Sequence, residues 1–283
     1  MKLQPEKKLK EEQELQTNMG AKQSVPTLEF IFLEQKDAAD ALNAAEQIDN
    51  YRTKCLNHNA NTISRRGQLY NAYNYQLHYR YIMEDTLQAS KKHLPNKLLN
   101  EIGQVRIVIL FPSADGGMPH TRPGNIICFP CQVDTPSFET IQHELWHIHQ
   151  RIYPEFWEKL LEKQWLFRPW LPSDELPLLL EKQRRYNPDT LKQPYWIWKD
   201  EWVPVPIFQN VTQPTLSECK IWWYNAKTEL VSHSLPPEVA SFFGSRMPAA
   251  AYEHPYEMAA YMLSLEPKEQ TPAWNAMKEV LNN

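Results

Sequence analysis

The stretch FETIQHELWHIHQRIY, residues 138–153, combines two sequence patterns. Apolar side chains recur in it at helical spacing, and the preceding Thr135 and Pro136 suit the N-cap and the first position of a helix. These apolar residues are Phe138, Ile141, Leu145, Ile148 and Ile152. The first pattern therefore predicts an amphipathic helix with one face in the protein core.

The second pattern lies on the other face of this predicted helix, where His143 and His147 are one turn apart. Two imidazoles four residues apart are able to bind one Zn²⁺ ion, and Glu144 stands beside the first of them. His149 falls back toward the apolar side, so we expect it to be a core or rim histidine and not a ligand. We interpret HELWH as a zinc-binding motif; the alternative is a coincidental pentapeptide in an ordinary helix.

A third ligand has to come from elsewhere, because catalytic zinc sites use three protein ligands and keep one position open. A second helix is predicted from Pro255 to about Leu265, and it would carry Glu257 in its first turn. Glu257 is therefore the expected third ligand. Glu253 and His254 are alternative ligands, and Glu257 could instead be a helix N-terminal carboxylate without a metal.

In two patches, the HELWH helix and the predicted helix that carries Glu257, the chain resembles the gluzincins. These are the thermolysin-like zinc peptidases, whose third ligand is a glutamate on a helix downstream of HExxH. The resemblance implies a zincin-like fold, metallopeptidase activity and zinc bound by His143, His147 and Glu257. Two features depart from the family pattern. A large insertion separates the patches, and Tyr261 stands where that group has an aspartate supporting a ligand histidine.

The expected reaction is hydrolysis of a peptide or protein substrate by metal-activated water, with Glu144 as the general base. The developing oxyanion also needs a donor other than the metal. Relatives of this type use a tyrosine or a histidine for this purpose. Three nearby residues are candidates, and the sequence does not choose among Tyr252, His254 and Tyr261.

Two β-branched runs upstream of the HELWH helix, residues 104–111 and 125–129, predict buried strands. Zincins usually bind an extended substrate along an edge strand just upstream of the active-site helix, and these runs are the candidates for it. The loop between the runs contains three of the chain's seven glycines, so it could closely approach a substrate backbone. A plain hairpin connection is the alternative.

Together these segments predict an α+β chain with one catalytic domain. The zincin-like domain would span 101–283, with a small mixed sheet, the active-site helix and an insertion at about 154–245. N-terminal helices over 26–100 and a flexible arm over 1–25 would precede it. The insertion is rich in proline and holds eight of the ten tryptophans, which predicts short helices and loops with one strand at 222–223. It would cover the cleft as a lid or specificity wall, or as a rigid cap.

Composition narrows the function classes. The net charge is −4 and no basic stretch is interleaved with aromatic residues, so we expect no nucleic-acid partner. No run approaches eighteen apolar residues and no secretory apolar region opens the chain, which predicts no membrane association and an intracellular, cytoplasmic protein. The four cysteines, including the pair Cys128 and Cys131, are expected to be reduced thiols.

Two other functions are compatible with the sequence. The chain could be a catalytically silent zincin-fold protein that binds a protein partner through the Trp-rich insertion. It could also be a zinc hydrolase of non-peptide amides, since fold alone does not define a substrate. Glu144 favours catalysis, because a purely structural zinc site needs no base.

Overall fold

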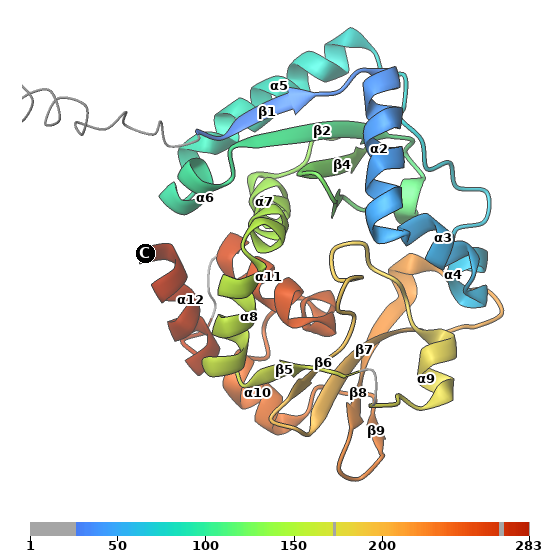
Figure 1. The fold of residues 1–283 in the computed structure, drawn as a ribbon, viewed down its shortest axis with the longest axis vertical. Coiled ribbons are helices and arrows are strands. Elements are labelled where there is room, and N and C mark those ends of the chain that lie inside the picture. Colours follow the sequence, from blue (N-terminus) through green and yellow to red (C-terminus); the bar gives the residue numbers. More distant parts are fainter. Residues whose placement is uncertain (1–26, 172–173, 266–268, 283) are drawn as a thin grey trace, which may run out of the picture.

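Two β-sheets lie on either side of a central group of helices (Figure 1). The computed structural model describes residues 27–171, 174–265 and 269–282. The fold is α+β, as predicted. The arm predicted over 1–25 lies outside the described residues.

The first sheet has four strands in the order β1-β2-β4-β3. β1 pairs with β2 and β2 with β4 in parallel, whereas β3 is antiparallel to β4. The strands are β1 (Glu29–Phe32), β2 (Gln104–Leu110), β3 (His120–Arg122) and β4 (Ile126–Pro130). The small mixed sheet and both predicted strands are thus present.

Two expectations about this sheet were wrong. β2 and β4 are parallel neighbours, so the glycine-containing loop between them is not a plain hairpin connection. Both strands are also internal. The edge strands are β1 and β3, and β3 lies within that loop. The hairpin joins β3 to β4, and Gly124 turns it with a φ of 84°, a left-handed conformation that glycine adopts without strain.

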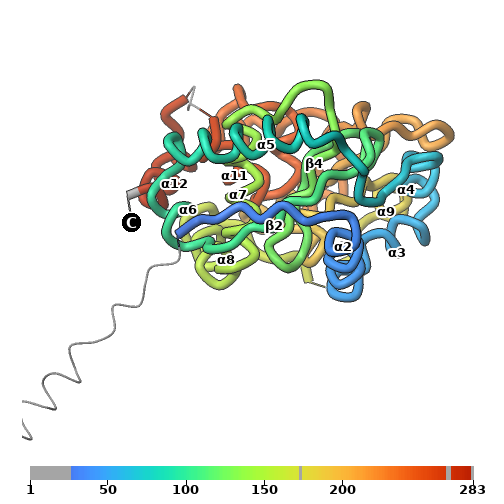
Figure 2. The backbone as a smooth tube through the Cα atoms, turned by 90° about the horizontal axis from the view of Figure 1, so that it is seen from above, coloured from blue at the N-terminus to red at the C-terminus, as the bar shows by residue number. Residues whose placement is uncertain are grey.

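Both faces of this sheet are buried, which explains why β4 is apolar throughout and β2 is apolar from Ile107 onward rather than alternating. Ile107, Ile109 and Phe129 face the central helices, while Val108 and Ile126 face helix α2. Figure 2 shows α5 and α2 on opposite sides of β2.

The N-terminal region is not purely helical, because β1 belongs to the same sheet as β2. β1 is only four residues long, so its sequence shows no clear alternation of apolar and polar residues. Its parallel partner β2 is distant along the chain. The helices of this region are α2 (Gln35–Asp49), α3 (Tyr51–Leu56), α4 (Asn59–Ser64), α5 (Leu77–Ser90), α6 (Asn96–Glu101) and the short η1 (Lys91–His93). Leu28 and the buried residues of α5 and α6 therefore share one core with the central helices, whereas α2, α3 and α4 pack in separate clusters.

The predicted amphipathic helix is α7 (Phe138–Ile152), and Ile141, Leu145 and Ile148 are buried on its core side. Its N-cap is Ser137, two residues later than expected. The Ser137 hydroxyl accepts a hydrogen bond from the backbone N–H of Thr140 at 3.2 Å, which satisfies one free donor of the first turn.

Helix α11 (Pro255–Ser264) begins at the predicted proline and packs along α7. Two glutamines of α7 hold the pair together through the backbone of α11. Gln142 donates to the carbonyl of Leu263 at 2.5 Å, and Gln150 donates to the carbonyl of Tyr256 at 3.0 Å. α12 (Pro272–Asn282) follows in the chain.

The insertion forms a second, antiparallel sheet of five strands in the order β5-β6-β7-β8-β9. The prediction of mainly short helices and loops was wrong, although residues 222–223 do lie in a strand. The elements are α8 (Pro154–Lys163), β5 (Phe167–Pro169), α9 (Leu178–Gln183), β6 (Trp196–Trp198), β7 (Trp202–Phe208), η3 (Leu216–Glu218), β8 (Cys219–Asn225), β9 (Val231–Ser232) and α10 (Pro237–Phe243).

Proline in β7 is compatible with this sheet because of how that strand is paired. β6 pairs with β7 only at Trp202, so the missing N–H groups of Pro204 and Pro206 interrupt no ladder on that side. The carbonyl of Pro206 instead accepts the backbone N–H of Arg185 at 2.7 Å. This bond anchors the start of a loop that reaches the candidate site.

Buried indoles join the insertion to the core, as expected from its composition. Trp198 donates its ring N–H to the carbonyl of Trp165 at 2.8 Å, and Trp165 donates to the carbonyl of Ala273 at 3.1 Å. Trp157 donates to Nδ1 of His149 at 2.9 Å, and Nε2 of His149 faces Glu101 at 2.9 Å. His149 is therefore a core histidine, as predicted.

The sequence also predicted reduced cysteines and no membrane association. The four cysteines are free thiols, and burial raises the pKa of Cys128 to about 12. Among the helices of the described ranges, none combines the length and apolar character needed to span a bilayer.

The hydrogen bond between Trp157 and His149 makes a testable contribution to stability. Trp157→Phe should lower the free energy of unfolding by about 1 to 3 kcal/mol, because it leaves a buried imidazole nitrogen without its donor. Urea denaturation measures this change. Trp222→Phe, at a half-buried indole stacked on His233, is the control and should stay within about 0.5 kcal/mol. Equal effects of the two substitutions would contradict the assignment.

Candidate metal centre

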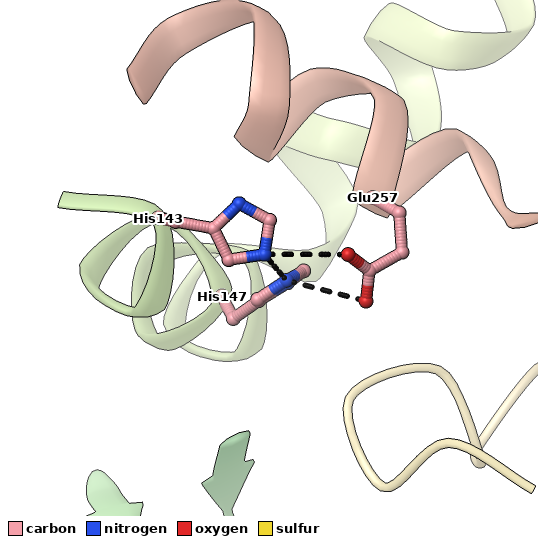
Figure 3. Close-up of side chains that lie close together, drawn as sticks. All are labelled: His143, His147 and Glu257. Carbon is pink, nitrogen blue, oxygen red and sulfur yellow. Dashed lines mark hydrogen bonds and ion pairs between the residues drawn. The ribbon is translucent and has the colours of Figure 1, made fainter. Parts of the chain in front are cut away.

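Helices α7 and α11 bring a pair of histidines together with a glutamate that is distant from them in sequence (Figure 3). His143 and His147 lie one turn apart on α7, and Glu257 lies in the first turn of α11. Within the described part of the chain, this is the one group of three potential ligands whose donor atoms all lie within 4.8 Å of one another.

The spacing of these atoms fits a metal ion. The two Nε2 atoms of His143 and His147 are 3.0 Å apart. The carboxylate oxygens of Glu257 lie 3.3 Å from Nε2 of His143 and 3.4 Å from Nε2 of His147. Ligands about 2.1 Å from a shared tetrahedral ion lie about 3.4 Å from each other.

Gln150 fixes which nitrogen of His147 faces the centre. Its amide nitrogen donates to the carbonyl of Tyr256, so its oxygen is the atom 2.8 Å from Nδ1 of His147 and must accept the proton there. The lone pair of His147 is then on Nε2, pointing at His143 and Glu257. A metal-binding histidine requires this tautomer.

The same three residues attract positive charge. Burial lowers the pKa of His147, but the nearby carboxylates of Glu257, Asp189 and Glu144 together outweigh it and raise that pKa to about 10. His143 is less constrained, because its Nδ1 is buried with no hydrogen-bond partner among the described residues. A cation bound between the three ligand atoms would balance the negative charge of the Glu257 carboxylate, as a proton on His147 does.

Asn187, from the insertion, supports the third ligand. Its amide nitrogen donates to Glu257 at 2.8 Å and to Glu253 at 2.5 Å. Sequence reasoning missed both Asn187 and the role of Gln150. Gln150 could have been found, because it lies one turn after His147 on the same helix. Asn187 gives no such local signal.

Glu144 is buried beside His143 and lines the same cavity. Among the described residues it accepts no hydrogen bond, and its Oε2 is shut off from solvent. Burial raises its pKa well above the usual range, and the nearby carboxylates of Asp189 and Glu257 act in the same direction. Glu144 thus has the free oxygens and the proton affinity of a general base.

The ligand group opens onto a cavity of about 680 Å³ with walls from distant parts of the chain. The start of α7 and the segment before β3 form one part of it. The other part is formed by α11 and the short η4 (Ala249–Glu253) together with the insertion loop at residues 185–189. The insertion therefore builds a wall of the cleft.

The three candidate oxyanion donors occupy different environments. The hydroxyl of Tyr252 donates to the carbonyl of Gly244 at 2.7 Å and does not line the cavity. Tyr261 does line it, with its ring 4.5 Å from that of His143, and its hydroxyl makes no hydrogen bond within the described residues. The structure directs Tyr261 to the cleft and Tyr252 away from it.

His254 caps α11 and is likewise directed away from the cleft. Its Nδ1 accepts the backbone N–H of Tyr256 at 3.1 Å, and its Nε2 is 2.9 Å from the carbonyl of Gln193, so both ring nitrogens are engaged. Burial lowers its pKa to about 4, which keeps the ring neutral. Glu253, the other alternative ligand, lines the cleft but is bound by Asn187. These contacts favour Glu257 as the third ligand.

Comparison with known proteins finds no relative: no family model, curated protein or solved structure matches the chain. The functional argument therefore depends on the geometry of the site itself.

The role of Gln150 predicts an effect on metal affinity. Gln150→Ala should weaken zinc binding by about 10- to 100-fold, because the ring of His147 loses the acceptor that fixes its tautomer. Competition with a chromophoric chelator measures the affinity. Gln164→Ala, which removes an exposed amide that contacts Glu279, should leave it unchanged. Unaltered zinc affinity in a folded Gln150→Ala protein would contradict this role.

Proposed function

We propose that this protein is a zinc-dependent metallopeptidase of the gluzincin type. His143, His147 and Glu257 would bind the ion, and Glu144 would act as the general base. The observation that carries the proposal is the position of Glu144: a carboxylate with free oxygens stands beside three ligand atoms at zinc spacing, in an open cleft.

We propose a catalytic rather than a structural zinc site because of the number of protein ligands. Structural sites are closed by four protein ligands, whereas catalytic sites keep a position for water or substrate. The described residues offer a group of three, and the cavity lies beside it. His254, the nearest further imidazole on α11, is engaged by the backbone instead.

Zinc bound at this site would polarise the scissile carbonyl and lower the pKa of a water molecule. Glu144 takes the proton of that water and passes it to the leaving amine. The burial that raises its pKa helps it to hold the proton between these two transfers. The hydroxyl of Tyr261 donates to the oxygen on which negative charge develops.

Glu144→Gln tests the proposal directly. This variant should retain one zinc per chain and lose at least about 100-fold in kcat, because the amide cannot accept the proton. Elemental analysis and cleavage of a mixed peptide library measure the two properties. Glu139→Gln is the matched control, since Glu139 is an exposed carboxylate lining the same cleft from the same helix. Its zinc content and kcat should stay close to those of the wild type.

Three outcomes would contradict the proposal. Folded wild-type protein without zinc would remove the metal site. Zinc without cleavage of any library peptide would exclude a peptidase and favour a silent protein or a hydrolase of other amides. Full activity in zinc-loaded Glu144→Gln would remove the assigned base.

A pair of tyrosine variants tests the oxyanion donor. Tyr261→Phe should lower kcat by about 100- to 1,000-fold with little change in zinc content, because it removes one donor to the transition state. Tyr252→Phe should leave kcat unchanged and cost about 1 kcal/mol of stability, through its lost bond to the carbonyl of Gly244. Steady-state kinetics and urea denaturation separate the two effects. Equal loss of kcat in both variants would exclude a specific role for Tyr261.

A further inference from the structure

The edge strand beside the cleft is closed to an extended substrate. Neighbouring residues of a strand direct their backbone groups to opposite sides, so Thr121 supplies the outward groups of the three-residue strand β3. Its N–H donates to Asp189 at 2.8 Å, and its carbonyl accepts from Arg151 at 3.2 Å. No free pair of backbone groups is left at Thr121 on which a long peptide could add as a strand.

Arg185, in the insertion loop that also lines the cleft, has a guanidinium that makes no hydrogen bond within the described residues. Its Nε is buried without a partner, and none of its side-chain nitrogens donates a hydrogen bond within the described residues. The nearest carboxylate oxygen, on Glu253, is 3.5 Å away, longer than the usual 2.7 to 2.9 Å of a charge-assisted bond. That same oxygen accepts a hydrogen bond from Asn187 at 2.5 Å.

The other charged groups of the cleft are mostly satisfied inside the protein. Asp115 is bound by Arg65 at 2.8 Å and by Tyr51 at 2.5 Å, and Asp189 is bound by Thr121. Arg185 is the sole lysine or arginine among the described residues that line the cavity. Apart from Glu144, the group of the cleft with unused hydrogen-bonding capacity is therefore the Arg185 guanidinium, which an anionic acceptor would satisfy.

The position of Arg185 relative to the ligands limits where this anion lies. Its guanidinium reaches Glu257 through Glu253 and Asn187, by contacts of 3.5, 2.5 and 2.8 Å. An extended peptide advances about 3.3 to 3.6 Å per residue, so this path spans fewer than three residues. An anionic group held there lies one or two residues from the bond that is cut.

We propose that Arg185 binds the free C-terminal carboxylate of a short peptide, so that cleavage removes the last one or two residues. This inference rests on the proposed peptidase function and names its substrate class. A guanidinium fork matches a carboxylate with two parallel hydrogen bonds, which an amide or a lysine does not reproduce. The closed edge strand and the available arginine donors favour the same conclusion independently.

The test measures binding, so that it does not depend on turnover. Zinc-loaded Glu144→Gln protein is immobilised and exposed to a randomised pool of N-acetylated tetrapeptides, once as free acids and once as C-terminal amides. Retained peptides are quantified by mass spectrometry. We expect the acids to be retained about 10- to 100-fold better than the amides.

The same measurement is repeated after a second substitution. Arg185→Gln should reduce retention of the acids to the level of the amides, and Arg185→Lys should restore it only in part. Arg184→Gln is the control, because Arg184 does not line the cleft, pairs with Glu181 at 2.9 Å and lies over the ring of Tyr186. It should keep the preference for acids. Zinc content and thermal unfolding are measured for every variant.

Several results would overturn the inference. Equal retention of acids and amides, or retention of neither, would exclude a carboxylate site. A preference that survives Arg185→Gln would place the carboxylate on the ion itself. Equal loss of both pools in Arg185→Gln would indicate a structural role for the arginine. Failure of the peptidase proposal is recognised separately, by wild-type protein that cleaves no peptide whether or not these binding differences are found.

Discussion

The contact between α7 and α11 is the constraint on which the candidate site depends. Gln150 links the helices and the metal ligands through one side chain, because its nitrogen binds the backbone of α11 while its oxygen fixes the tautomer of His147. Helix register and ligand orientation are thereby coupled. A shift of α11 by one residue would move Glu257 away from the two histidines and break the same glutamine bond.

The two sheets have different relations to this pair of helices. The mixed sheet is buried on both faces and supports α7 through a continuous apolar core. The antiparallel sheet of the insertion contributes polar groups, because the bond from Arg185 to β7 anchors the loop that carries Asn187 and Asp189. That loop binds Glu257 on one side and closes strand β3 on the other. The insertion therefore supports the ligands and limits access to them.

The charged side chains of the cleft differ in how many hydrogen-bond partners they have. This difference separates those that join segments of the protein from those that remain available for chemistry. Asp115, Asp189 and Glu253 are carboxylates whose oxygens are bound by neighbouring donors, and they serve to join segments. Glu144 is enclosed by protein and accepts no hydrogen bond among the described residues, and Arg185 has a buried Nε without a partner and only a 3.5 Å ion pair with Glu253. Leaving buried polar groups unpaired costs free energy, so the protein retains here two groups that a substrate or a transferred proton would satisfy.

The sequence by itself determined the local features. Periodicity predicted α7, Pro255 marked the start of α11, and HELWH placed His143 and His147 on one face, because helical spacing depends only on nearby residues. The sequence also nominated Glu257 as the third ligand, and the packing of α11 on α7 places it beside the histidines. Tertiary structure alone decided the orientation of Tyr252 and Tyr261, the strand β1 and the antiparallel sheet of the insertion. These features depend on contacts between residues far apart in the chain. No local pattern encodes them, since strand pairing and side-chain direction are set by how the whole chain packs.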